Sequence, residues 1–338
     1  MKMKAMAVAA FLLAPGAARA DTHAPWPAHW NNWNDSALWV TVGNPGNTGE
    51  WSGESFGGYG DDRICGAVGY TFKIGKFEVT AGQYTAFLNA KAATDPYDLY
   101  NHFMWDNDRG CKIRRFGTPG SYTYSVAEDW ANRPVNLVTW GDAARFCNWL
   151  TSGQTKDGSY YLNGAMSYED LAAVTRKANG RYFIPTEDEW YKAAYYNRAT
   201  DSYYDYPTGT NTLPSNDVAD PDPGNSANFQ QGGDAIGQPY MRTEVGEYEN
   251  SASPYGTFDQ GGNVWEWNET VPLPRFRGLR GGTYNDGAVF LTAAARYLDG
   301  AGDDSTMTGF RIVEVPEPAT LLLLAFGGLA SVRRRRGA

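Results

Sequence analysis

The chain has 338 residues, of which 42% are hydrophobic and 14% aromatic, so it can bury one large core or two small ones. Its 39 glycines and 18 prolines argue against a helical bundle and indicate many turns and short elements, with large rings filling the space between them. The formal net charge is −9, which disfavours binding to the phosphates of nucleic acid.

The first twenty residues have the composition of a secretory signal peptide. Lys2 and Lys4 precede the apolar stretch AMAVAAFLLA, and AARA supplies small residues for cleavage after Ala20. We therefore expect an exported protein and leave residues 1–20 out of the fold. Residues 21–60 are rich in Trp, Asn, Gly and Ser without clear periodicity. That composition predicts a leader or a loosely packed entry segment.

A tighter pattern begins near residue 64. The stretch VGYTFKIGKFEVT (68–80) alternates as a pair of strands would, with a turn at Gly75 and Lys76. Three helices are then predicted by one shared device: a threonine that can cap the helix, a Gln, Asp or Glu three residues later, and apolar residues at helical spacing. The predicted starts are Thr80 with Gln83, Thr139 with Asp142, and Thr186 with Glu189.

Beyond residue 200 the helical signals nearly vanish. Region 205–240 is dense in Gly, Pro, Asn and Asp but contains aromatic residues throughout, which predicts irregular, packed loops. Short strands are expected in LRGGTY (279–284), FLTAAARY (290–297) and GFRIVEV (309–315). We find no internal repeat and no second linker, so one domain over 61–315 is the simplest organisation.

The C-terminal stretch, 316–338, has three parts in a fixed order. A Pro-Glu-Pro sequence precedes an apolar run, Ala319–Val332, and four arginines follow at 333–336. The fourteen residues of the run are few for a membrane span, which needs about 20. The order resembles the PEP-CTERM sorting signal of Gram-negative bacteria. That resemblance implies recognition by an exosortase, transient association of the tail with the inner membrane, and a location in the cell envelope or outside the cell. A plain C-terminal anchor is the alternative.

The remaining body is strongly acidic. The two ends carry seven basic residues and one acidic residue, which leaves 22 basic and 37 acidic residues and a net charge of −15. Such a body is expected to be soluble, to avoid nucleic acid and to offer carboxylates to calcium.

Three cysteines remain, and export permits a disulfide. Cys147 lies on the apolar face of a predicted helix, which favours a buried free thiol. Cys65 and Cys111 are therefore the candidate disulfide pair, with two free thiols as the open alternative.

Six segments occur in an order that resembles one known family: FEVTAGQYTAFLNA, RPVNLVTWGDAARFCNWL, YFIPTEDEWYKAAYY, GGNVWEW, LRGGTY and GFRIVEV. Together they resemble the formylglycine-generating enzyme (sulfatase-modifying factor) superfamily from about Phe72 to Val315. The resemblance implies an α+β fold of the C-type-lectin type, with few long elements and much irregular loop. It does not imply one activity, because the family includes sulfatase-modifying enzymes, iron enzymes and ligand-binding proteins without catalysis.

Two cysteines that follow the family's RGGS strand carry the formylglycine-generating chemistry, because a pair of thiolates suits Cu(I). The matching segment here, 283–297, contains no cysteine: Asn285 and Asp286 stand near the first position, and Phe290 and Leu291 near the second. We therefore expect neither this activity nor copper. Iron is not expected either, because it needs a histidine cluster and the chain has only 3 histidines, His23, His29 and His102.

Calcium is the cofactor that the resemblance still implies. The family holds calcium with loop carbonyls, an asparagine and carboxylates near two of the quoted segments. The matching positions here are Asn228, Asn263 and Glu266, with Asp234 in the intervening loop. The alternative is that both asparagines cap turns and that Glu266 pairs with an arginine such as Arg280 or Arg311.

Arginines and tryptophans complete the framework that the resemblance implies. Arg280, Arg296 and Arg311 are expected to pair with core carboxylates, with a substrate clamp as the alternative. Trp265 and Trp267 are expected to wall the core or a groove. The predicted function is a noncatalytic binding module for a polysaccharide or a protein, since Tyr, Trp, Asn and Asp in 95–130 and 200–260 suit stacking on sugars and hydrogen bonding to them. The alternative is a divergent enzyme with a rebuilt active site.

Overall fold

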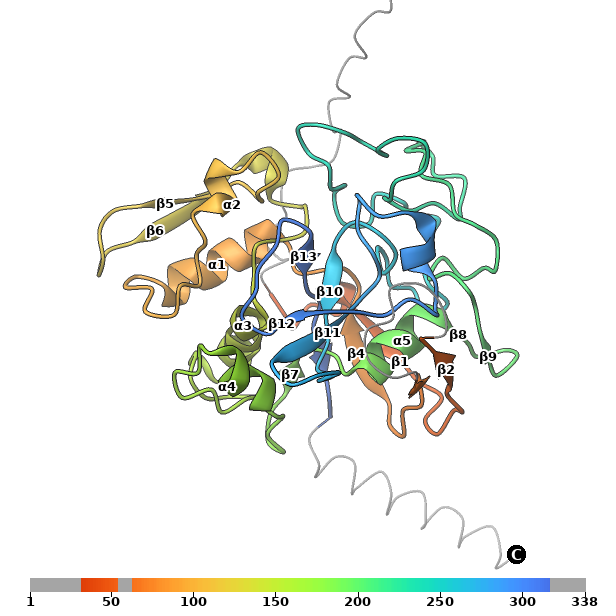
Figure 1. Ribbon diagram of the computed structural model, residues 1–338, viewed down its shortest axis with the longest axis horizontal. Helices are drawn as coiled ribbons and strands as arrows, with labels where there is room; N and C mark the ends of the chain where they lie inside the picture. Colours follow the sequence, from red (N-terminus) through yellow and green to blue (C-terminus); the bar gives the residue numbers. More distant parts are fainter. Residues whose placement is uncertain (1–31, 54–62, 317–338) are drawn as a thin grey trace, which may run out of the picture.

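The computed structural model describes residues 32–53 and 63–316 (Figure 1). The predicted signal peptide and nearly all of the predicted sorting tail lie outside the described residues. In Figure 1 the first helices and the hairpin that follows them lie at one side of the body, and the long loops of residues 204–264 lie at the other. No helix among the described residues is long and apolar enough to cross a membrane.

The first sheet brings together both ends of the described chain. Its strand order is β1 (Trp39–Val42), β4 (Phe72–Gly75), β14 (Val313–Glu314) and β7 (Tyr182–Phe183), with every neighbouring pair antiparallel. Val42, Phe72, Ile74 and Val313 bury their side chains in the core. Sheets of this kind place alternate residues on the buried face, which explains why these four are apolar.

Two sequence expectations fail in this sheet. Residues 21–60 were expected to form a leader or a loosely packed entry segment, but Trp39–Val42 is a strand of the core sheet, so the packed body begins before residue 60. Residues 68–80 were expected to form a hairpin, but only Phe72–Gly75 is a strand, and its partners come from distant parts of the chain. The alternating pattern identified the buried face correctly and the partner wrongly, because alternation carries no information about which strand lies alongside.

The second sheet carries the GGNVWEW and LRGGTY segments. Its order is β12 (Tyr297–Gly300), β11 (Phe276–Arg280), β10 (Trp265–Trp267) and β13 (Thr308–Gly309), and only the β10–β13 pair is parallel. Glu266 lies directly opposite Arg280 in the register. The strand expected over 290–297 is wrong: a 3-10 helix, η4 (Ala288–Leu291), and a turn occupy most of it.

The three predicted helices are confirmed, with their caps. They are α1 (Ala81–Lys91), α3 (Trp140–Ser152) and α5 (Glu187–Tyr195), and each begins with a complete capping box. In α5, Thr186 Oγ1 accepts from the Glu189 amide at 3.1 Å, and Glu189 Oε2 accepts from the Thr186 amide at 2.7 Å. The device satisfies two backbone donors that the first helical turn leaves without partners.

The remaining elements are short. They are the helices α2 (Phe103–Asp106) and α4 (Tyr168–Ala173), the 3-10 helices η2 (Ser36–Leu38) and η3 (Glu128–Trp130), and the two-stranded sheets β2 (Glu50–Ser52) with β3 (Arg63–Cys65), β5 (Ile113–Phe116) with β6 (Thr123–Val126), and β8 (Tyr196–Asn197) with β9 (Ser202–Tyr203). The long loops are irregular and packed, as expected: Phe229, Met241 and Tyr248 are buried. Few helices and many short strands confirm the α+β class.

Candidate functional site

A buried carboxylate, Glu187, joins three arginines at the start of helix α5. Arg280 donates to Glu187 Oε1 through Nε at 2.9 Å, and Arg296 donates through its own Nε at 2.7 Å. Arg63 from β3 approaches Oε2 at 3.1 Å. Burial alone would raise the pKa of Glu187, but the guanidinium charges of Arg280, Arg296 and Arg63 outweigh it and lower the pKa to about 2. Glu187 is therefore ionised and fully engaged.

A second buried carboxylate, Glu266, lies between the two tryptophans of GGNVWEW. Its Oε2 accepts from Trp190 Nε1 at 2.7 Å and from Arg311 Nε at 2.5 Å, and its Oε1 accepts from Arg311 Nη2 at 2.6 Å. Both oxygens have charged or polar partners and the side chain is buried. This arrangement fits an internal clamp between β10, α5 and the segment that joins β13 to β14, with both carboxylate oxygens engaged by the protein itself.

The segment 283–297, where the family's thiols would stand, is packed at several positions, although Asn285 and Val289 are exposed. Trp265 stacks on Tyr297 at 5.2 Å between ring centroids and meets the edge of Phe290 at 5.9 Å. Tyr284 and Leu291 are buried in the same segment. Trp267 is also buried and donates from Nε1 to the Val138 carbonyl at 3.0 Å. Aromatic groups thus occupy the space beside the RGGT strand.

The four residues expected to hold calcium do not converge. Asn228 Nδ2 donates to Asn263 Oδ1 at 3.0 Å, so these two side chains bind each other. Asp234 lies exposed on the surface, and Glu266 is held by Arg311. Among residues 32–53 and 63–316, no group of three or more His, Cys, Asp or Glu could hold a metal ion. The calcium site expected from these four residues therefore stays a prediction.

The expected Cys65–Cys111 disulfide is wrong for this structure. All three cysteines are free and buried. Cys65 packs with Trp190 and Tyr191, whereas Cys111 belongs to the main core. Arg280 Nη2 donates to Cys65 Sγ at 3.3 Å. Burial raises the pKa of Cys65 to about 11, although Arg280 and Arg63 oppose the change, so this thiol is protonated near neutral pH.

A polar cleft with a volume of about 560 Å³ lies away from these clamps. It is lined by the Asp106–Arg109 turn, Gln238 and Thr306. The turn is rigid, because Asn107 Oδ1 accepts from the Arg109 amide at 2.8 Å and Lys112 Nζ donates to the Asn107 carbonyl at 2.8 Å. Asp106, Asp108 and Gln238 are exposed. The cleft joins the two stretches, 95–130 and 200–260, that were expected to suit a sugar ligand.

A buried arginine, Arg242, supports the floor of this cleft. Its Nη1 donates to the carbonyls of Arg109 at 2.8 Å and Thr306 at 3.4 Å. Asn136 Nδ2 donates to the same two carbonyls at 2.8 and 2.6 Å. Arg242 Nε and Nη2 have no hydrogen-bond partner, and burial lowers the pKa of the side chain to about 10. Arg242 is therefore a buried cation held by carbonyl dipoles rather than by a carboxylate of the described chain.

Sequence reasoning missed Glu187 and Arg242. Glu187 is the first residue of a helix that the sequence did predict, and acidic residues are common there. Its three arginines lie between 93 and 124 residues away along the chain, so spacing carried no signal for them. Arg242 lies in the irregular loops, where no periodicity indicates which side chains are buried.

Two family models match this chain, and together they cover most of it. The description "Sulfatase-modifying factor enzyme 1-like domain" fits residues 67–315, and "PEP-CTERM protein-sorting motif" fits residues 314–336. A curated relative, hercynine oxygenase of Mycobacterium tuberculosis (strain ATCC 25618 / H37Rv), is 26% identical over 216 residues. That match covers 62% of this chain and 39% of the relative, so the chain spans about two-fifths of the relative's length.

Solved structures share the fold. The crystal structure of CarF superposes with a TM-score of 0.53 at 20% identity and covers 82% of this chain and 98% of that one. Treponema denticola variable protein 1 superposes with a TM-score of 0.50 at 19% identity and covers 82% of this chain and 95% of that one. These likenesses, with the short strands and few helices, support the expected C-type-lectin-like architecture.

Proposed function

The chain belongs to the sulfatase-modifying factor enzyme 1-like domain family and carries a PEP-CTERM sorting motif, and from this premise we propose that it is an exported, noncatalytic module that binds a polysaccharide in its polar cleft. The sorting motif indicates export to the envelope of a Gram-negative bacterium through an exosortase. The single observation that carries the proposal is the cleft itself, in which the Asp106–Arg109 turn meets Gln238 and Thr306.

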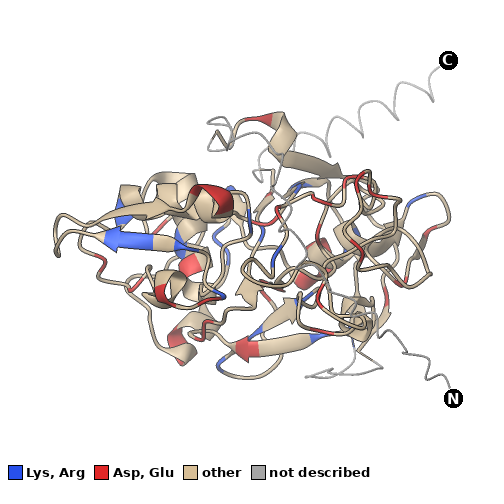
Figure 2. Ribbon diagram, turned by 90° about the horizontal axis from the view of Figure 1, so that it is seen from above, with Lys and Arg blue, Asp and Glu red and all other residues tan. Residues whose placement is uncertain are grey.

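The chemistry of the cleft suits hydroxyl groups. Carboxylates such as Asp106 and Asp108 accept hydrogen bonds from sugar hydroxyls, and the Gln238 amide can both donate and accept. Arg109 adds a planar donor group. The body is acidic, and Figure 2 shows its carboxylates spread over the molecule. Long-range repulsion therefore favours a neutral polysaccharide over an acidic one.

The absence of catalysis is supported by what occupies the family's reaction locus. Segment 283–297 has no cysteine, and Trp265, Phe290 and Tyr297 pack against one another beside it. The buried carboxylates Glu187 and Glu266 each form ion pairs with arginines, so their oxygens are engaged by the protein itself.

A glycan array followed by calorimetry with two double variants tests the binding proposal. We expect Asp108→Ala/Gln238→Ala to weaken binding of the selected neutral glycan at least about tenfold, since each lost hydrogen bond contributes roughly 1 kcal/mol. Glu128→Ala/Gln154→Ala removes the same two chemical groups from exposed positions outside the cleft and serves as the matched control. Equal affinity of both double variants and the parent protein would sink the assignment to this cleft.

A divergent oxidative enzyme is the second candidate, favoured by the similarity to a protein named hercynine oxygenase. The expectations that copper and iron are absent stay predictions. The decisive assay incubates the chain with copper, or separately with iron, and with a sulfatase-derived cysteine peptide, and then reads the peptide by mass spectrometry. We expect no aldehyde and no peptide oxidation above a metal-only control. A product that depends on the protein would establish the enzyme instead.

A further inference from the structure

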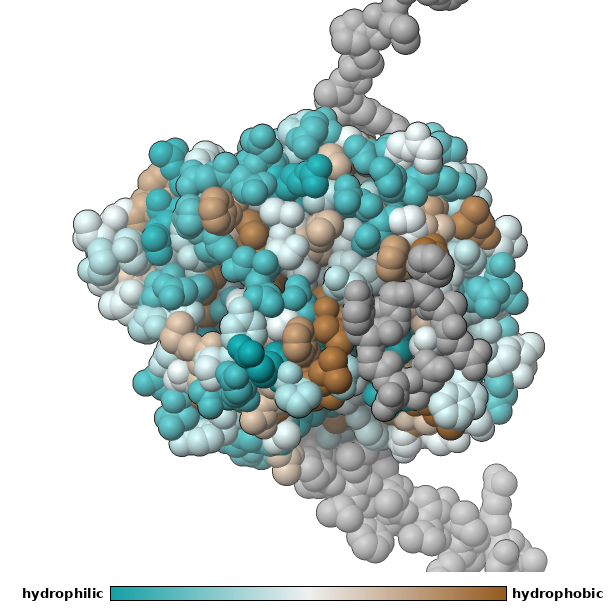
Figure 3. Space-filling model, in the orientation of Figure 1, coloured by the Kyte–Doolittle hydropathy of each residue, from teal (hydrophilic) through white to brown (hydrophobic). Residues whose placement is uncertain are grey.

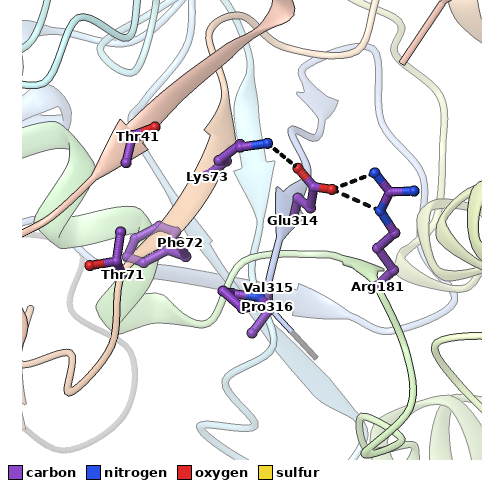
Figure 4. A pocket seen from close by; sticks show the side chains of 8 residues that line it. All are labelled: Thr41, Thr71, Phe72, Lys73, Arg181, Glu314, Val315 and Pro316. Carbon is purple, nitrogen blue, oxygen red and sulfur yellow. Dashed lines mark hydrogen bonds and ion pairs between the residues drawn. The ribbon is translucent and has the colours of Figure 1, made fainter. Parts of the chain in front are cut away.

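A second pocket lies where the chain leaves the folded body. Its volume is about 400 Å³, and it is lined by Thr41 of β1, Thr71 and Lys73 around β4, Arg181, Glu314 and Pro316. Figure 4 shows Lys73 and Arg181 on opposite sides of Glu314. The pocket thus gathers two cations, two hydroxyls and one carboxylate across strands β1, β4 and β14 of the first sheet, together with the apolar residues Phe72 and Val315.

Glu314 binds both cations. Because it supplies one negative charge against two positive ones, the described lining of the pocket keeps one net positive charge. Lys73 Nζ lies 2.9 Å from Glu314 Oε2, and Arg181 Nη2 lies 2.6 Å from Oε1. Burial would raise the pKa of Glu314, but Lys73 and Arg181 outweigh it and lower the pKa. The Lys73 and Arg181 side chains remain 51% and 47% exposed, so both can reach a further anion. A guanidinium and an ammonium with neighbouring hydroxyls are typical ligands of a phosphate group.

The sequence that follows fixes how far this pocket can lie from a membrane. The sorting motif begins at residue 314, within the pocket, and the apolar run begins at Ala319. Two residues separate Pro316 from Ala319, and the three chain steps between them span about 10 Å at most when fully extended. The polar headgroup layer on each face of a bilayer is roughly 5–8 Å thick. While the apolar run is in the membrane, the pocket is therefore held at the headgroups.

We propose that this pocket binds the phosphate of an anionic phospholipid headgroup while the tail is in the membrane. The inference rests on the predicted membrane association of the tail, and it does not depend on the polysaccharide site. The role of headgroup binding by this pocket follows from the net charge of the protein body. A body with a net charge of −15 is repelled by an anionic membrane, and one locally positive pocket at the tail exit orients that body with the sorting motif toward the bilayer.

Photo-crosslinking in nanodiscs tests the proposal with the full chain. A p-benzoyl-phenylalanine at Gly69, an exposed position beside the pocket with open space for a side chain, is activated in discs that contain equal amounts of phosphatidylglycerol and phosphatidylcholine, and lipid adducts are counted by mass spectrometry. We expect about fivefold more adduct with phosphatidylglycerol, the factor expected for one net basic charge. Lys73→Ala/Arg181→Ala should remove this preference. Lys91→Ala/Lys177→Ala removes the same charge away from the pocket and should keep it.

Three outcomes would overturn the proposal. Equal adduct with both lipids would mean that the pocket does not select an anionic headgroup. Loss of the phosphatidylglycerol adduct in millimolar glycerol 3-phosphate would mean that the pocket takes a free phosphate compound, because a tethered lipid has too high an effective concentration to be displaced so easily. Failure of the parent chain to float with the discs would remove the premise of a membrane-associated tail. None of these results bears on glycan binding, which is measured separately.

Discussion

The buried charges of this protein are handled in two opposite ways. At the start of α5, Glu187 faces Arg63, Arg280 and Arg296, so each of these cations has a carboxylate as a direct partner. Beneath the polar cleft, Arg242 is as deeply buried, but its hydrogen bonds go to carbonyl oxygens and its guanidinium lies 5.6 Å from the centroid of the Trp130 ring, with Nε and Nη2 making no hydrogen bond. A network paired in this way fits a framework that must not move when it lies at the start of α5. Burying a cation without a carboxylate partner costs stability. Its position under an open cleft therefore fits a role in ligand binding rather than in stabilising the fold.

The contrast extends to the surface. Figure 3 shows that the face seen in Figure 1 is largely hydrophilic, with hydrophobic side chains in smaller patches. The polar cleft lies in loops, and loops held by a rigid framework are where binding residues concentrate. The framework and the cleft should therefore respond differently to substitution, and four experiments test that difference.

The largest expected effect comes from removing a charge of the framework. Glu187→Gln leaves the buried Arg280 and Arg296 without their carboxylate, while Arg63 keeps Asp188, and should lower the free energy of unfolding by about 3–5 kcal/mol, measured by denaturant titration. In the parent protein the folded pKa lies below the unfolded value, so this stabilisation is present above about pH 4.5 and is lost as the pH falls towards 2. Glu128→Gln on the surface is the control and should change stability by less than about 0.5 kcal/mol.

A pair of arginine substitutions tests the contrast directly. Arg280→Met removes one of the three cations that face Glu187 and the donor to the buried Ala293 and Ala295 carbonyls, and should cost about 3 kcal/mol or more. Arg242→Met removes a cation that has no carboxylate partner and should cost about 1 kcal/mol or less, the loss coming from the two carbonyls that it binds. Thermal and denaturant unfolding of both variants give the comparison. A cost for Arg242→Met that equals the cost for Arg280→Met would show that Arg242 belongs to the framework after all.

Asp142 gives a smaller effect and depends on pH. It caps α3 as Glu189 caps α5, but burial raises its pKa to about 7 despite its hydrogen bonds with Thr139. Its folded pKa lies above the unfolded value, so its contribution to stability is present below about pH 4 and is lost as the pH rises through 7. Asp142→Asn should remove this decline, which we expect to be about 1–3 kcal/mol between pH 5 and pH 8. Parallel pH profiles for the variant and the parent would contradict the assignment.

The smallest effects are expected from reductant and chelator. All three cysteines are free and buried, so dithiothreitol should leave the melting temperature unchanged, and mass spectrometry after denaturation should count three alkylated thiols. Chelation should also have little effect, because Glu266 is already neutralised by Arg311. Bound calcium in metal analysis, with a fall in melting temperature after chelation, would restore the calcium site expected from Asn228, Asp234, Asn263 and Glu266.

Sequence reasoning succeeded where the physical signal is local. The three capping boxes at Thr80, Thr139 and Thr186 are confirmed residue by residue, because a cap depends only on residues within one turn. The family and the sorting motif were also recognised from ordered segments. Strand pairing was less accurate: 290–297 forms a 3-10 helix and a turn rather than a strand, and Trp39–Val42 joins the core sheet from a segment expected to lie outside it.

The stretch GGNVWEW shows how the two kinds of information divide. The sequence by itself determined that this segment belongs to the family framework and that the RGGT strand lacks the copper thiols, since both depend only on residue identity and order. Only the tertiary structure decided what Glu266 does, because its partners Trp190 and Arg311 lie 76 and 45 residues away. The same holds for Glu187, for the free thiols of Cys65 and Cys111, and for the cleft over Arg242. Each depends on which distant side chains share one low-dielectric space, and that follows from packing rather than from spacing along the chain.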